Sequence, residues 1–344
     1  MAAPPDLRWH LEGDDDTQPP LFGDGVERHV GRGEYRGLEF LHVNARRLVN
    51  EVPAASRMPF RYTINAYRGC SHACTYCFAR PTHEFLGMNI GDDFDRRIVV
   101  KINAVERLRA ELAPSRWAGE HIAMGTNTDP YQRCEGKYGL TQGIVGELAA
   151  ARNPFSILTK STLILRDLDL LAEAARVTGV RANFSIGTLD EEVWKLTEPG
   201  TPHPRQRVEA VARLMAAGVP CGVLVAPVLP GLSDRPDQLE AVVKACVGAG
   251  AVSITPLLLH LRPGVREHYL GWLAGTRPDL VADHERLYPR SYAPKARQRE
   301  LAQLVAGLVA RHGGRSASPL QTRSVPTPVS TASPPEIRQL ALGI

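Results

Sequence analysis

The sequence predicts an α/β protein whose core is an open, partial (β/α)6 barrel of the TIM type, with an N-terminal extension and a helical C-terminal segment. Six short apolar segments predict strands, and a helical spacing of apolar residues follows each of the first five. Regular alternation of this kind favours a parallel sheet with right-handed crossovers. Segment 222–225 is apolar throughout, as expected of a strand covered on both faces. Six units are too few for the eight-fold barrel, so an open barrel is expected.

The chain of 344 residues divides into four parts by composition. Residues 1–36 contain acidic and proline clusters without a sustained apolar period, which predicts a mobile N-terminal arm. Residues 37–261 form the barrel core with its lead-in, and residues 262–313 form the C-terminal helical segment. Residues 314–344 are rich in Pro, Ser and Thr, which predicts a disordered tail.

The elements of the core follow one another at short intervals. An approach to the first strand lies at 58–65, and the later strands are expected at 121–125, 155–159, 180–186, 220–225 and 251–255. Helices are expected at 97–112, 140–151, 165–177, 204–217 and 236–247, and then at 267–273 and 295–309 in the C-terminal segment. Helix 204–217 begins with Pro and is followed by Gly218, the usual asymmetry of helix ends.

Three of the six cysteines lie in one short segment, residues 69–78, directly after the first expected strand. They are Cys70, Cys74 and Cys77, and the next cysteine, Cys134, is far along the chain. Three thiolates on one loop can hold three irons of a [4Fe–4S] cluster and leave the fourth iron with an open position. The spacing therefore predicts such a cluster, with the three cysteines as its metal ligands.

A structural zinc site is the alternative interpretation of the same segment. It would use the three cysteines with His72 or His83, and the protein would then be a zinc-stabilised binding module without chemistry. Zinc loops usually come as two paired half-sites, and the sequence has no second Cys-x2-Cys. Of the other cysteines, Cys221 and Cys246 are interpreted as core residues, whereas Cys134 lies in a polar segment where a further role is conceivable.

The overall composition is that of an ordinary soluble globular protein, with 43% hydrophobic and 23% charged residues. A net charge of +4 is too small to argue for nucleic-acid binding by itself. No apolar run reaches the roughly 18–20 residues that a membrane helix needs. Six cysteines without a visible export signal favour a reducing compartment, so we expect the protein in the cytoplasm and not at a membrane.

Polar residues follow the expected strands, where a barrel gathers its functional side chains. Residues 126–129 follow the second strand, Lys160 and Ser161 the third, and Ser185 and Thr188 the fourth. Because these positions share one rim with the cysteine segment, we expect Lys160 to lie beside the open iron, where its ammonium group could meet a carboxylate.

The Cys-x3-Cys-x-Tyr-Cys motif resembles the signature of the radical SAM superfamily, and residues 50–261 are similar to its branch related to spore photoproduct lyase (DNA repair photolyase-like), in particular to an uncharacterised bacterial subgroup. The segments that carry the resemblance are 65–77, 80–84, 125–132, 158–161, Ser185, 198–207 and 227–232.

This resemblance implies a radical SAM core and two cofactors, a [4Fe–4S] cluster and S-adenosyl-L-methionine (SAM). By correspondence, Cys70, Cys74 and Cys77 match the cluster ligands, and Lys160, Ser185 and Arg207 match residues beside the SAM. The implied reaction is reductive cleavage of SAM to a 5′-deoxyadenosyl radical, which abstracts hydrogen from a substrate. An external one-electron donor of the flavodoxin or ferredoxin type is expected. Neither the substrate nor a residue that acts on it is identified.

The sequence departs from the lyase pattern at one place. Spore photoproduct lyase carries a cysteine just after its second strand that returns a hydrogen atom to the product radical, whereas residues 126–129 here contain no thiol. Direct repair of the spore-type thymine lesion is therefore not expected. A DNA-lesion lyase of that type is kept as the alternative function, and a nucleic-acid substrate stays possible.

Overall fold

The computed structural model describes residues 26–53, 56, 58–113 and 117–314. Six parallel strands form one sheet in chain order, which confirms the open, partial (β/α)6 barrel. They are β4 (Tyr62–Ile64), β7 (Ile122–Met124), β8 (Phe155–Thr159), β9 (Val180–Ser185), β10 (Cys221–Val228) and β11 (Ser253–Leu258). Strand β3 (Val49–Glu51) pairs antiparallel with β4 at one edge, while β11 forms the other edge, so the sheet stays open.

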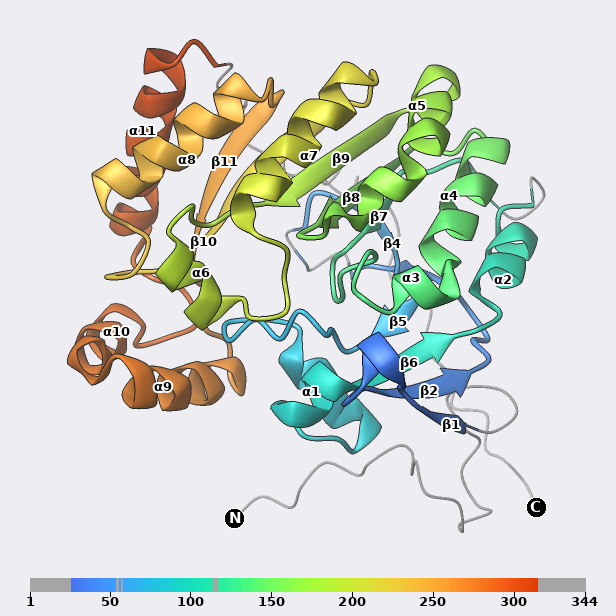
Figure 1. The fold of residues 1–344 in the computed structure, drawn as a ribbon, viewed down its shortest axis with the longest axis horizontal. Helices are drawn as coiled ribbons and strands as arrows, with labels where there is room; N and C mark the ends of the chain where they lie inside the picture. Colours follow the sequence, from blue (N-terminus) through green and yellow to red (C-terminus); the bar gives the residue numbers. More distant parts are fainter. Residues whose placement is uncertain (1–25, 54–55, 57, 114–116, 315–344) are drawn as a thin grey trace, which may run out of the picture.

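Helices connect these strands and cover the outer face of the sheet (Figure 1). They are α2 (Ala104–Glu111), α4 (Leu140–Ala150), α5 (Leu168–Val177), α7 (Pro204–Ala216) and α8 (Pro236–Gly248). Helix α11 (Lys295–Arg311) packs against α8 and β11 and extends this layer. Alternate strand positions are buried, as Ile157, Phe184 and Val223 illustrate with at most 1% exposure. Positions between them, such as Ser156 and Asn183, are only partly buried.

A second, four-stranded sheet lies below the barrel in Figure 1, and the sequence did not predict it. Its order is β1 (Glu27–Val30), β2 (Glu39–Val43), β6 (Arg97–Lys101) and β5 (Tyr67–Arg68). The prediction of a helix over 97–112 is wrong for its first part, because 97–101 is strand β6 and α2 begins only at Ala104. Ile98, Val99 and Val100 are fully buried in succession, which suits a β-branched strand covered on both faces and not a one-sided helix.

The prediction of a mobile N-terminal arm does not fit residues 27–35, which have regular structure. Residues 27–30 form strand β1, which pairs antiparallel with β2, and 33–35 form a 3-10 turn. Residues 1–25 of the arm and 315–344 of the predicted tail lie outside the described residues. The division at 37, 262 and 314 stays a prediction.

The remaining helices shape the loops around the barrel mouth and the C-terminal segment. They are η2 (Arg80–Leu86), α1 (Asp92–Arg96), α3 (Glu135–Tyr138), η3 (Thr162–Asp167), α6 (Glu191–Thr197), α9 (Val265–Thr276), η4 (Pro278–Leu280) and α10 (Val281–Leu287). The helix expected at 165–177 starts as the 3-10 turn η3 and becomes α-helical at Leu168, while 267–273 and 295–309 lie inside α9 and α11. Among the described helices, none has both the length and the apolar character needed to cross a bilayer.

Candidate metal and cofactor site

The cysteine loop, defined as residues 69–78, begins at the end of strand β5. Gly69 adopts φ +79°, and a Cβ there would lie 2.9 Å from both the His83 ring and the Phe94 carbonyl oxygen. Only glycine fits this left-handed, crowded position without strain. The next residue, Cys70, donates its backbone N–H to the Phe94 carbonyl oxygen over 2.9 Å. The chain therefore enters the loop in a fixed direction.

The three cysteines of the loop are free thiols in a largely buried place. Cys70 and Cys74 are each 7% exposed, and half-buried Cys77 packs against the apolar clusters of both. Burial raises the pKa of Cys74 to about 12. Burial also raises the pKa of Cys70 well above its ordinary value, with Asp129 and the two other cysteines adding to the effect. Three largely buried thiols on one short loop suit a metal cluster, whose positive irons would stabilise the thiolates.

The two histidines of the zinc alternative have other contacts. Nδ1 of His72 lies 3.4 Å from the Asp129 carboxylate, and Nε2 of His83 lies 3.0 Å from the Arg97 carbonyl oxygen. Within the described residues, neither histidine joins the cysteines in a set of ligand atoms that all lie within 4.8 Å of one another. Ligands of one tetrahedral zinc ion are roughly 3–4 Å apart. The three thiols do not form such a set among themselves either, which suits a cluster, where each thiolate would bind a different iron, better than one zinc ion.

The loop after strand β7 holds the cysteine loop from one side. Gln132 accepts the Ser71 N–H at 3.0 Å and donates from its amide nitrogen to the Gly69 carbonyl oxygen, also at 3.0 Å. The Thr128 hydroxyl donates to the same carbonyl at 2.6 Å. Sequence analysis identified segment 125–132 as a mark of the family but not this positioning role. A polar residue three positions after Asp129 carries no local signal of a partner at Ser71.

Asp129 links three neighbouring loops at the barrel mouth. Its carboxylate accepts the Thr159 hydroxyl at 2.6 Å and the Lys160 backbone N–H at 2.7 Å, and it also faces His72. Because Thr159 and Lys160 end strand β8, Asp129 ties that strand end to the loop after β7. Lys160 is thereby fixed at its backbone next to the cysteine loop.

Helix α6 and the turn after it hold the cysteine loop from the other side. Thr75 donates its N–H to the Thr197 carbonyl oxygen, and Gly200 donates its N–H to the His72 carbonyl oxygen, both at 3.0 Å. A Cβ on Gly200 would lie 2.2 Å from the Ser71 carbonyl oxygen. The close approach of these two backbones therefore requires glycine at position 200.

Lys160 lies where the sequence predicted it, beside the cysteine loop. Its ammonium nitrogen is 5.6 Å from the centre of the Tyr76 ring, within the range of a cation–π contact. Burial alone would lower the pKa of Lys160, but the neighbouring Cys74 and Glu198 outweigh burial and raise it. The side chain is therefore a cation near Cys74, suited to hold an anionic group.

Glu198 and Arg207 form a buried ion pair next to Lys160, at 2.5 Å, with neither side chain more than 5% exposed. Glu198 also accepts the Tyr76 hydroxyl. Burial would raise the pKa of Glu198, but Arg207, Lys160 and the Tyr76 hydrogen bond hold it below its ordinary value. The carboxylate therefore connects the cysteine loop to helix α7, which carries Arg207. Sequence analysis did not single out Glu198.

Arg207 and Ser185, the two other predicted cofactor residues, contact each other. Nη1 of Arg207 donates to the Ser185 carbonyl oxygen at 3.1 Å, and the Ser185 hydroxyl donates to the Ala226 carbonyl oxygen at 2.6 Å. With its bonds to Pro202, Thr201 and Glu198, Arg207 uses four of its five N–H donors on the protein. The structure thus brings Lys160, Ser185 and Arg207 to one region, and their roles toward a cofactor stay predictions.

Cys134 does not lie on an open polar loop, as the sequence suggested. It is fully buried at the start of helix α3, in the core cluster that also contains Tyr67 and Phe40. Burial, together with Glu135, raises the pKa of its thiol well above the ordinary value. The physical reason for the difference is that α3 packs its first turn against the second sheet, which the sequence did not predict.

The model of one protein family, described as the radical SAM superfamily, matches residues 64–244. An uncharacterised protein of Mycobacterium tuberculosis is 45% identical over 320 residues, which span 92% of this chain and 94% of that protein. An uncharacterised protein of Methanocaldococcus jannaschii is 29% identical over 199 residues, 57% of this chain and 70% of that protein.

Two solved structures have a similar fold. Spore photoproduct lyase complexed with a dinucleoside spore photoproduct superposes with a TM-score of 0.60 at 17% identity, covering 80% of both chains. Streptococcus suis SuiB bound to S-adenosylmethionine superposes with a TM-score of 0.50 at 12% identity, covering 74% of this chain and 48% of SuiB. At these identities the likeness concerns the fold.

Proposed function

The chain belongs to the radical SAM superfamily, and from that premise we propose that Cys70, Cys74 and Cys77 bind one [4Fe–4S] cluster whose open iron binds SAM. The observation that carries the proposal is the set of three free thiols on one short, largely buried loop, with the Lys160 cation beside Cys74. Loops from β7, β8 and β9 hold this set at the carboxyl end of the parallel strands, where barrels carry their active sites.

We propose a different contact with SAM, or a supporting position beside it, for each of Lys160, Ser185 and Arg207. Lys160 has a raised pKa and is proposed to hold the SAM carboxylate by a charge-assisted hydrogen bond. Ser185 is proposed to line the same pocket. Arg207 has most of its donors engaged, so we place it at the pocket edge, where it fixes Glu198 and the backbone of Ser185.

The proposed reaction is radical formation by reductive cleavage of SAM. A cluster held by Cys70, Cys74 and Cys77 would supply the electron for cleavage of the sulfur–C5′ bond, and the resulting 5′-deoxyadenosyl radical would abstract a hydrogen atom from the substrate. An external donor of the flavodoxin or ferredoxin type is proposed to deliver that electron. The burial of Cys70 and Cys74 would help to keep water away from the reaction. Because cluster thiolates persist in reducing conditions, we propose a cytoplasmic location.

Anaerobic reconstitution tests this proposal. We expect a brown protein with about four irons and four sulfides per chain, which after reduction converts SAM to 5′-deoxyadenosine. Incubation with deuterated candidate substrates, nucleic acids included, should move deuterium into the 5′-deoxyadenosine when the right class is present. Replacing the three loop cysteines by Ala should abolish iron binding, whereas C246A, in the core beneath α8, should keep it.

Stoichiometric zinc without SAM cleavage would contradict the proposal and favour the zinc-stabilised binding module. A cluster of the expected iron content that never cleaves SAM would keep the metal assignment and overturn the reaction.

A further inference from the structure

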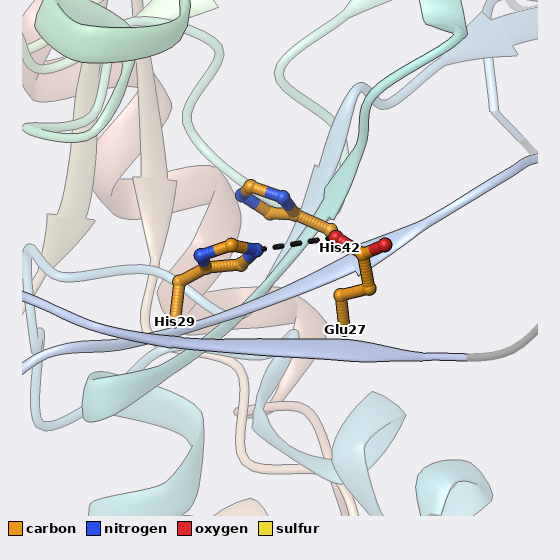
Figure 2. A group of neighbouring side chains, drawn as sticks. All are labelled: Glu27, His29 and His42. Atoms are coloured by element: carbon orange, nitrogen blue, oxygen red, sulfur yellow. Dashed lines mark hydrogen bonds and ion pairs between the residues drawn. The ribbon is translucent and has the colours of Figure 1, made fainter.

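A second group of metal-ligating side chains lies on the four-stranded sheet, outside the cysteine loop. Glu27, His29 and His42 each offer one ligand atom, and these atoms all lie within 4.8 Å of one another. Figure 2 shows Glu27 and His29 on strand β1, with the His29 ring turned toward the Glu27 carboxylate and the His42 ring above them. Among the described residues, this is the group of three His, Cys, Asp or Glu side chains that meets the distance requirement of one ion.

The strand register brings these three side chains to one face. In the antiparallel pair β1–β2, Glu27 lies opposite His42, and His29 lies opposite Phe40. Residues two apart on a strand share a face, so Glu27, His29 and His42 project from the same side of the sheet. The two imidazole rings approach to 3.9 Å between centroids, tilted by 31°. Two imidazole rings and a carboxylate at adjacent positions form a compact donor set.

A hydrogen-bonding partner fixes the ring of His42. Nε2 of His42 lies 2.7 Å from the Tyr138 hydroxyl. In metal sites a ligating histidine typically engages its other ring nitrogen in such a bond, which fixes the ring and leaves one lone pair for the metal. Lys137, whose ammonium sits over the Phe40 and Tyr138 rings, is the nearby charge that opposes a cation.

We propose that Glu27, His29 and His42 bind a divalent transition-metal ion of the zinc type, which fixes strand β1 to strand β2. Two imidazoles and one carboxylate are a donor set that zinc and its neighbours prefer over calcium or magnesium. The ligand atoms lie within 4.8 Å of one another, whereas ligands on one zinc ion are roughly 3–4 Å apart, so binding would draw the three side chains together. Because the side chains are exposed or half-buried, water would complete the coordination.

The role we assign to this metal is structural. Strand β1 has four residues, three of them exposed, and it forms the edge of its sheet. Such a short edge strand has few contacts of its own, so a bond from each of two β1 side chains to an ion held also by β2 would reduce its fraying. The site is independent of the cysteine loop and of the function proposed for it.

The test uses the full chain with its cluster already reconstituted, so that the loop thiols are occupied. Anaerobic calorimetric titration with Zn²⁺ should detect one site, and a H29A/H42A double substitution should weaken it at least roughly ten-fold. The matched control is H312A, because His312 faces only one carboxylate, that of Glu240, at 3.0 Å. That variant should bind Zn²⁺ like the parent.

Cobalt(II) identifies the ligands in the same preparation. Binding at the proposed site should give visible d–d bands without a thiolate-to-cobalt charge-transfer band, and Co²⁺ should slow hydrogen exchange of the β1 amides. Equal Zn²⁺ affinity in the parent and the double variant would overturn the proposal, and so would a thiolate band. E27Q, which keeps the side-chain shape, provides a milder second variant that should also weaken binding. Iron content and SAM cleavage, measured in parallel, report separately on the cysteine loop.

Discussion

Glu198 is ion-paired with Arg207 at 2.5 Å in a place where both side chains are almost wholly buried. The pair lies between the aromatic residue of the cysteine motif and helix α7, since Glu198 also accepts the Tyr76 hydroxyl. Removing one partner of such a pair leaves a buried charge without compensation. Segment 198–207 was identified as a mark of the family, but its pattern does not predict that its two end residues form this buried contact at the barrel mouth.

Replacing Glu198 by Gln should destabilise the protein by about 3–5 kcal/mol, because Arg207 would remain buried and unpaired. Urea unfolding at neutral pH measures this change. The matched control is E191Q, which breaks the exposed Glu191–Lys195 pair on helix α6 and should leave the unfolding midpoint unchanged. Equal midpoints for E198Q and the parent would show that the buried pair is not required.

Replacing Lys160 by Ala should weaken SAM binding by roughly 10- to 100-fold, the effect of losing one charge-assisted hydrogen bond. Iron content should not change, because Lys160 is not a cluster ligand. Equilibrium dialysis with the reconstituted protein measures the affinity, and K195A on exposed helix α6 serves as control. Unchanged affinity in K160A would make the lysine a structural cation for Glu198 and Cys74.

Replacing Gly200 by Ala should lower both stability and cluster loading. The new Cβ would meet the Ser71 carbonyl oxygen at 2.2 Å, so the cysteine loop must shift, at a cost of about 1–3 kcal/mol. Iron analysis after reconstitution and thermal unfolding measure the two effects. G271A is the control, since a Cβ there meets nothing within 4 Å and alanine favours helix α9. Full iron loading in G200A would argue against a tight backbone contact at Ser71.

The reconstituted enzyme should not repair the spore-type thymine lesion. Returning a hydrogen atom to the product radical needs a good donor, and residues 126–129 offer hydroxyl and amide groups whose bonds to hydrogen are stronger than that of a thiol. Cys134, the one nearby thiol in the sequence, is fully buried in the core. Chromatographic assay of the dinucleoside lesion checks this expectation, and clean turnover to two thymines would refute it.

Stability should fall as the pH drops from about 6.5 to about 4. Burial, with Arg80, lowers the pKa of His268 from 6.5 to about 4, so the unfolded chain binds a proton in this range that the folded chain does not. This contribution is present above pH 6.5 and is lost on acidification. In H268Q the slope of unfolding free energy against pH should be smaller, while the profiles above pH 7 should run parallel. Identical slopes would mean that the pKa of His268 is the same in the folded and the unfolded chain.

The repeating part of the fold could be predicted because each βα unit carries its own periodicity. Strand β8 has the predicted bounds, and helix α7 differs only by one residue at its end. The second sheet could not be predicted, because Ile98 continues the helical spacing of the apolar residues in α2, and the pairing of β6 with β2 is a long-range contact. In the site, spacing identified the cysteines, whereas the roles of Gln132, Glu198 and Gly200 arise only from long-range backbone contacts.

The cysteine loop is held by two segments that lie far later in the sequence, and this order matters during synthesis of the chain. Ser71 meets Gln132 across 61 residues of chain, and Tyr76 meets Glu198 across 122. A nascent chain that has emerged only through Cys77 therefore lacks both supports, and its three thiols form no fixed site. Insertion of the proposed iron–sulfur cluster would then follow translation past Gly200 and the folding of most of the barrel. Cells short of cluster donors should accumulate a folded apoprotein, ready to be loaded, and not an unfolded chain.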